Sequence, residues 1–201
     1  MRLTPRWIEG WTLFALLAAA LIIMSGGLFL WDGGDSDAAR LVIRATARTS
    51  LICFLAAFAA SATVRLWPRP FTYWLRRNRR QFGLAFALSH LIHATAIIAL
   101  HRIDPSIFWR LTTPGSIISG SIAYAFIAAM AAPSFDAAVR AMGPRTWGIL
   151  HRVGTWFIAL SFLIANGKRI PASGTYAIPV AALLVVVMLR RAAHGTQLPQ
   201  T

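Results

Sequence analysis

Three histidines lie inside long apolar runs of this sequence, where a polar side chain is costly. His90 and His93 occupy the middle of the run 82–100, and His151 lies about one turn inside a later run. About 20 residues suffice to cross a bilayer as a helix, so the first of these runs is long enough to span one. Imidazoles at membrane depth are rare and usually mark a function. At a spacing of three, His90 and His93 share one side of a helix.

Imidazoles from two facing helices are a standard means of holding a haem iron from both sides. Coordination would also remove the penalty of leaving a polar group unpaired in an apolar setting. A zinc site is less well supported, because no Cys or carboxylate accompanies the histidines. A proton-relay transporter would require acidic residues at mid-membrane depth, and the runs carry none there. Hydrogen-bonded packing histidines are the plainer alternative to haem.

The composition indicates a polytopic membrane protein. The chain has 201 residues, of which 57% are hydrophobic, against about 45–50% in soluble domains. The formal charge is +14, from 20 basic and 6 acidic residues. The basic residues fall between the apolar runs, as lipid and topology require, so no nucleic-acid partner is expected. The only cysteine, Cys53, cannot form an internal disulfide.

The expected fold is all-α: one polytopic transmembrane domain over residues 1–201, built as a six-helix bundle. The predicted spans are 7–31, 45–65, 82–101, 115–133, 147–166 and 174–190. The loops after spans two and four carry eight arginines, whereas the other three loops hold five basic residues and four of the six acids. By the positive-inside rule both termini are cytoplasmic. The arginine-rich composition favours a bacterial source, so the expected location is the bacterial plasma membrane, as a multi-pass protein.

Three local features accompany these spans. The segment 65–81 contains six arginines and no acid, and Pro68 and Pro70 prevent a continuous helix through it. It is predicted to anchor the chain at the interface, with a docking surface for a soluble protein as the alternative. Arg44 and Arg48, one turn apart, are expected to snorkel to the headgroups. Pro179 is expected to kink the last span or to mark its first turn.

Two stretches resemble segments of the ferric reductase-like transmembrane domain family. Arg79-Arg80-Gln-Phe-Gly83-Leu84-Ala-Phe86, followed by His93, is similar to that family's RRxxGLxAFxxxxLH segment. Trp147-Gly-Ile-Leu150-His151-Arg152-Val153 is similar to its WxxLHRLxY segment. The likeness covers roughly residues 45–190. It implies b-type haem held by histidines of the third and fifth helices, and electrons passed across the membrane from a cytoplasmic reductant or a quinone.

The resemblance departs from the family pattern at two positions. The family's fifth helix carries two histidines separated by twelve residues; the first matches His151, but the second falls on Ile164. Thr155 stands where the family has tyrosine. Three arrangements therefore stay open. His93 or His90 pairs with His151 around one haem, a five-coordinate haem sits on His93, or this branch keeps the fold without haem.

The sequence thus predicts a haem b membrane electron-transfer protein with His93 and His151 as axial ligands and His90 in reserve. Arg79, Arg80 and Arg152 are expected near the haem propionates, or else as inner-face anchors. The chain has no NAD or flavin module, so it would be an electron-transfer component of an oxidoreductase, beside a periplasmic or cytoplasmic redox partner. The alternative is a haem-free scaffold that binds a partner through its Gly/Ala/Ser-rich fourth span and segment 65–81.

Overall fold

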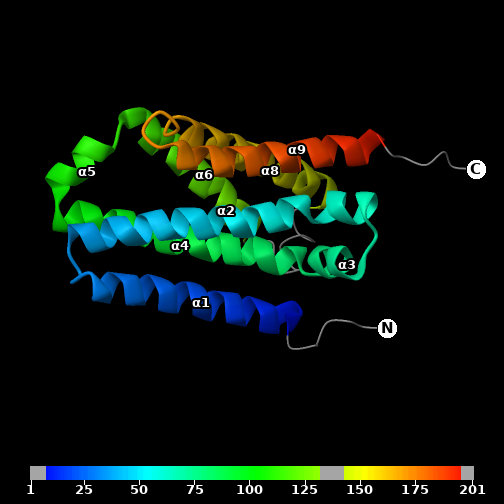
Figure 1. Cartoon of the computed structure of the whole chain (residues 1–201), viewed down its shortest axis with the longest axis horizontal. Coiled ribbons are helices and arrows are strands. Elements are labelled where there is room, and N and C mark those ends of the chain that lie inside the picture. Colours follow the sequence, from blue (N-terminus) through cyan, green and yellow to red (C-terminus); the bar gives the residue numbers. More distant parts are fainter. Residues whose placement is uncertain (1–7, 132–142, 196–201) are drawn as a thin grey trace, which may run out of the picture.

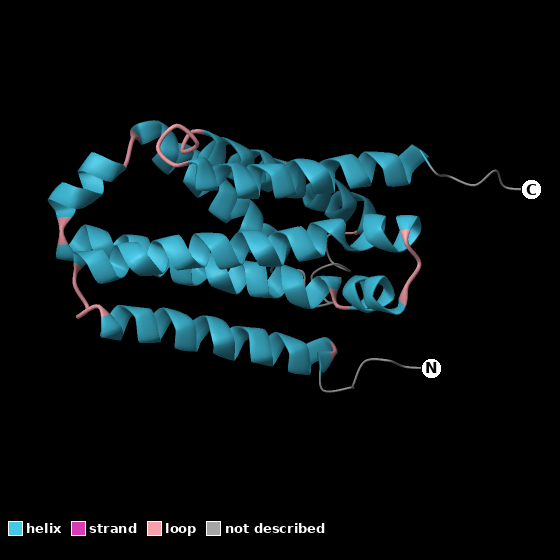
Figure 2. Ribbon diagram, viewed as in Figure 1, coloured by secondary structure: helices cyan, strands magenta, loops and turns pink. Residues whose placement is uncertain are grey.

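The computed structural model describes residues 8–131 and 143–195. Figure 2 shows that this part of the chain is built of helices joined by short loops, with no strand. Six helical segments within it are long and apolar enough to cross a membrane. The protein is therefore a multi-pass membrane protein, and the predicted all-α fold with six spans is confirmed.

The six spans lie alongside one another as a bundle (Figure 1). They are α1 (Gly10–Trp31), α2 (Ser36–Leu66), α4 (Arg79–Ile103), α6 (Pro114–Ala131), α8 (Pro144–Gly167) and α9 (Ala177–Gly195), the last preceded by the short turn η3 (Gly174–Tyr176). Two short helices, α3 (Pro70–Arg77) and α5 (Pro105–Leu111), join α2 to α4 and α4 to α6. Pro179 falls in the first turn of α9, which is the second of the two effects expected of it.

Helices α2 and α4 form the most extensive helix pair and carry the centre of the core. Small residues are fully buried along this contact, among them Ala60, Ala85 and Ser89, and they let the two backbones approach closely. Phe54, Phe58 and Phe86 fill the space toward α8 and α9. Figure 1 shows α1 on one side of this pair, and α6, α8 and α9 on the other.

Helix α2 begins at Ser36, well before the predicted span start near residue 45. Asp35 caps it by accepting hydrogen bonds from the backbone amides of Asp37 and Ala38. Its 31 residues correspond to about 46 Å, more than the roughly 30 Å of a hydrocarbon core. Because its first turns extend beyond the apolar layer, Arg44 and Arg48 are exposed near one end, as their predicted snorkelling requires.

The basic segment 65–81 turns the chain back sharply at one end of the bundle. Helix α2 ends at Leu66, and α3 begins with Pro70, so the predicted break at the two prolines is confirmed. Asn78, between α3 and α4, is 1% exposed. Its Oδ1 accepts a hydrogen bond from the Gly10 amide at 2.8 Å, which fixes the start of α1 to the start of α4. Residues 133–142, between the predicted fourth and fifth spans, lie outside the described part of the chain.

Candidate functional site

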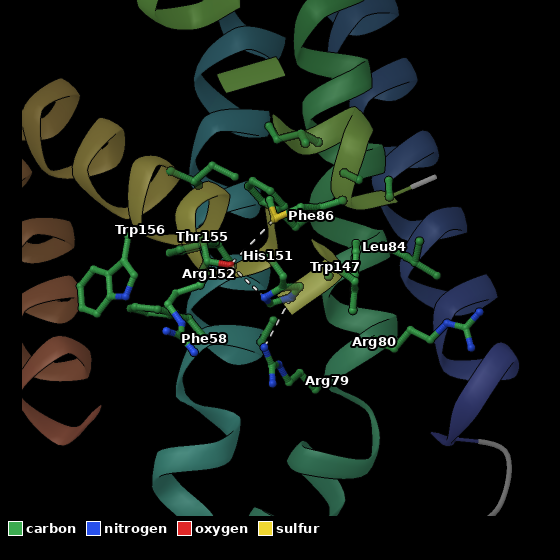
Figure 3. Close-up of a pocket in the computed structure, with 18 of the residues that line it drawn as sticks. Phe58, Arg79, Arg80, Leu84, Phe86, Trp147, His151, Arg152, Thr155 and Trp156 are labelled. Atoms are coloured by element: carbon green, nitrogen blue, oxygen red, sulfur yellow. Dashed lines mark hydrogen bonds between the residues drawn. The ribbon is translucent and has the colours of Figure 1, made fainter. Parts of the chain in front are cut away.

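A cavity of about 700 Å³ lies among α2, α4, α6, α8 and α9 (Figure 3). Its walls combine small and aliphatic residues with aromatic and cationic ones. The aromatic side chains are Phe54, Phe58, Phe86, Trp147 and Trp156, and the cationic ones are Arg79, Arg80, Arg152 and Arg190. No Asp or Glu is among the described residues that line it. The size is typical of cofactor pockets, and the charge favours an anionic occupant.

His151 projects into this cavity from α8, about two turns from the start of the helix. Its Nε2 lies 3.5 Å from Nη2 of Arg79, and its Nδ1 lies 3.3 Å from Oγ1 of Thr155 (Figure 3). A guanidinium only donates hydrogen bonds, so Nε2 must be the acceptor and Nδ1 must carry the proton. The proton on Nδ1 then points to Thr155, and the Nε2 lone pair is left facing Arg79. This is the tautomer that binds a metal through Nε2.

The contacts around Thr155 support this assignment. Because its Oγ1 accepts from His151, its own proton is free to point to Sδ of Met130 on α6, at 3.9 Å. Gly154 allows α6 to come this close: a Cβ at that position would lie 3.0 Å from both Met130 Sδ and Phe126 Cδ1. The helix pair α6–α8 therefore orients the His151 ring through Thr155.

His90 and His93 belong to a different cluster, on the contact between α2 and α4. Nδ1 of His93 lies 2.9 Å from Oγ1 of Thr46. Thr46 is wholly buried, and its carbonyl accepts a hydrogen bond from Ser89. The His90 ring packs between the rings of His93, Phe86, Tyr124 and Phe162. The His90 Nδ1 and the Tyr124 hydroxyl are enclosed and have no hydrogen-bond partner among the described residues.

The structure does not bring the two sets of histidines to one point. At 1.5 Å per residue, His93 lies about 21 Å along α4, and His151 about 10 Å along α8. Both helices start at the same end of the bundle, where Arg79 of α4 meets His151. Two nitrogens that bind one metal lie only about 4 Å apart, at about 2 Å per bond. This distance is much smaller than the difference in height between His93 and His151. Neither His90 nor His93 lines the cavity, and Phe86 lies between His90 and the cavity.

The predicted arginines all lie at the cavity, in different environments. Arg79 is half-buried beside His151, whereas Arg152 is exposed. Arg80 is exposed at the edge, extending toward α1 (Figure 3), with its guanidinium 5.5 Å from the Trp11 ring.

Sequence reasoning missed Arg190 and His194, both on α9. Arg190 lines the cavity, donates to the Phe58 carbonyl at 2.8 Å and stacks 4.2 Å from the Phe58 ring. His194 is exposed but lines the same cavity. In the sequence, Arg190 has no acidic residue nearby and lies one turn before His194. This pattern could have pointed to both residues.

The comparison with protein families identifies the family of the chain. The family model described as ferric reductase-like transmembrane component matches residues 45–162. The chain belongs to this family. The match runs from α2 to Phe162 of α8 and so includes His93 and His151. No curated protein and no solved structure matches the chain.

Members of this family typically bind haem and carry electrons across a membrane. The residues present here fit one haem. The cavity is large enough, His151 offers an Nε2 lone pair, the aromatic walls suit a flat macrocycle, and the arginines suit its carboxylates.

Proposed function

We propose that this protein binds haem b in the cavity, with His151 as the axial ligand, and passes electrons across the membrane to an acceptor. One observation carries the proposal: His151 presents Nε2, held only by a 3.5 Å contact with Arg79, to a cavity of about 700 Å³ that has aromatic and arginine side chains and no acid among its described lining residues. Haem b, when bound, supplies one-electron transfer. The chain's own residues bind it, orient it and keep water away.

Each of these tasks falls to named side chains. Nε2 of His151 would hold the metal, and Thr155 would fix the ring by accepting a hydrogen bond from its Nδ1–H group. Arg79, Arg152 and Arg80 would pair with the carboxylates through charge-assisted hydrogen bonds. Phe54, Phe58 and Trp156 would limit the access of water and thereby set the local polarity, which tunes the redox potential.

The first experiment is a dithionite-reduced minus oxidised visible spectrum of the detergent-purified protein, expressed with ample haem. We expect a Soret band and about one haem per chain. A sharp α-band would show that a second strong-field ligand joins His151, and His194 would be the first residue to replace. Complete absence of a Soret band would overturn the proposal.

Within the family, the two motifs most resemble MsrQ, the haem-binding membrane subunit of the periplasmic methionine sulfoxide reductase system. We propose a similar setting: the bacterial plasma membrane, both termini cytoplasmic and a redox protein as partner. The starts of α1, α4 and α8 and the end of α9 share one end, which the basic segment 65–81 also occupies (Figure 1). A C-terminal alkaline phosphatase fusion should be inactive; an active fusion would reverse the orientation.

A haem-free scaffold is the second candidate. Two points favour it: by the resemblance, Ile164 stands where the family has a second histidine, and it is 46% exposed; and His93 already has a partner in Thr46. If it is right, replacing His90, His93 and His151 together by Leu should leave folding and partner binding unchanged. Under the haem proposal the same variant loses all bound haem.

A further inference from the structure

A second, smaller pocket lies next to the cavity, among α2, α4 and α9. It measures about 170 Å³ and is lined by Ser61, Ala62, Arg65, Arg79, Arg190, Ala193 and His194. Its volume is about a quarter of that of the cavity. That is enough for one small polar group and too little for a macrocycle. Arg65 lines this pocket but not the cavity.

Three guanidinium groups converge on this pocket, and no Asp or Glu is among the described residues lining it. Like charges this close repel one another, and the repulsion grows as water is excluded. The contacts of Arg79 do not offset the charge, because Nη1 lies 3.5 Å from the Ser61 hydroxyl and Nη2 faces an imidazole. Arg190 donates to one carbonyl, and its Nε is enclosed without a partner in the described part of the chain. An anion in the pocket would offset this positive charge.

The position of the pocket identifies the class of anion. Arg65 lies one residue before the end of α2, Arg79 is the first residue of α4, and Arg190 lies in the last two turns of α9. The pocket therefore lies at the headgroup level of a membrane-spanning bundle, where basic pockets between helices bind lipid phosphates. Arginine forks match phosphate oxygens in geometry.

We propose that the pocket formed by Arg65, Arg79 and Arg190 binds one phosphate group, the phosphodiester of an anionic phospholipid. Free phosphate offers the same chemistry from solution. The pocket shares Arg79, Arg190 and His194 with the cavity, and Arg65 lines the pocket alone. Arg65 therefore separates this proposal from the haem proposal. A lipid held there would join α9 to α2 and α4 at the end of the bundle.

The experiment measures phosphatidylglycerol binding to the delipidated full-length protein by native mass spectrometry. Diacylglycerol with the same acyl chains is the lipid control, because it lacks the phosphate. The test variants are Arg65→Gln and Arg190→Gln. The matched control is Arg191→Gln, which removes an exposed arginine of α9 that lines neither pocket. Haem content is recorded for every sample.

We expect phosphatidylglycerol to bind and diacylglycerol not to bind. Each test variant should weaken binding about tenfold, as the loss of one charge-assisted hydrogen bond implies, and Arg191→Gln should change it less than twofold. If millimolar inorganic phosphate displaces the lipid, or alone raises the melting temperature of wild type but not of Arg65→Gln, free phosphate occupies the site as well. Equal weakening by all three variants, or equal binding of diacylglycerol, would overturn the proposal. If Arg190→Gln fails to fold, the Arg65→Gln variant alone tests the proposal, because Arg65 is exposed.

Discussion

The cavity around His151 and the cluster around His90 and His93 both place imidazoles inside a membrane bundle, yet their surroundings differ. His151 has one weakly held nitrogen facing open space and arginines. His93 is held at 2.9 Å by a buried threonine, and His90 is enclosed by rings. A histidine that binds a cofactor needs room in front of a lone pair, whereas one that packs helices needs a partner. What distinguishes the two sets of histidines is the open space in front of a ring nitrogen, rather than depth in the membrane.

The largest effect should come from filling the cavity. Gly148 lines it, and a Cβ there meets nothing within 4 Å. Gly148→Phe should therefore fold but lose nearly all bound haem, because the new ring occupies the space in front of His151. Gly120→Phe on α6 is the matched control, since Gly120 also has nothing within 4 Å but does not line the cavity. Full haem content in Gly148→Phe would move the haem site elsewhere.

A smaller effect is expected from the partner of His151. Thr155→Val keeps the side-chain shape but removes the oxygen that accepts the Nδ1 proton. Loss of such a partner lowers metal affinity about tenfold or more, so haem titration should show a correspondingly weaker complex. Thr95→Val, on an exposed part of α4, should leave the affinity unchanged. An unchanged affinity in Thr155→Val would mean that Thr155 does not orient the ring.

The close approach of α6 and α8 should affect stability more than binding. Gly154→Ala places a methyl group 3.0 Å from Met130 and Phe126, and overpacking of this kind costs about 1–3 kcal/mol. Met130 is flexible, so we expect a cost near 1 kcal/mol, measured by unfolding in detergent. Gly148→Ala on the same helix should cost nothing measurable. Equal stability of the two variants would show that the close approach of α6 and α8 at Gly154 does not limit the size of the side chain there.

The histidine cluster should respond in stability alone. Ser89 is wholly buried and links α4 to Ser50, Thr49 and the Thr46 carbonyl. Interhelical hydrogen bonds in membranes contribute about 0.6 kcal/mol on average and up to about 1.7. Ser89→Ala should therefore lower the free energy of unfolding by about 1 kcal/mol and leave haem content unchanged. A loss of haem in this variant would show that the cluster around His90 and His93 takes part in cofactor binding.

The smallest effect concerns the far end of the bundle. Hydrogen bonds from the Ser106 hydroxyl and the Ile107 amide hold the pKa of Asp104 below its ordinary value of 3.8. A lowered pKa stabilises the folded form above that value, and the contribution is lost as the pH falls through the folded pKa. The protection factor of the Ile107 amide, its exchange rate corrected for the intrinsic pH dependence, should therefore fall only in acid, and Asp104→Asn should abolish that change. A protection factor that falls toward alkaline pH instead would contradict the cap.

The spans could be predicted because each run is long and apolar enough to be recognised as a membrane-spanning helix. The early start of α2 could not, since residues 36–44 are too polar for a span, although Asp35 is an ordinary cap. The motifs pointed to Arg79, Arg80, His151 and Arg152, which line one cavity, and to His93, which does not line it. They could not show that Arg190 reaches Phe58, which lies 132 positions away, or that Thr46 engages His93. Such pairings depend on how helices pack, which spacing along one helix does not encode.

The most direct test compares haem content and reduced spectra in two variants prepared alongside wild type. One is His151→Ala, and the other is the double variant His90→Leu, His93→Leu. We expect His151→Ala to lose its haem and the double variant to retain about one haem per chain with an unchanged reduced spectrum. The opposite result, with haem kept by His151→Ala and lost from the double variant, would contradict the account and assign the cofactor to the α2–α4 cluster.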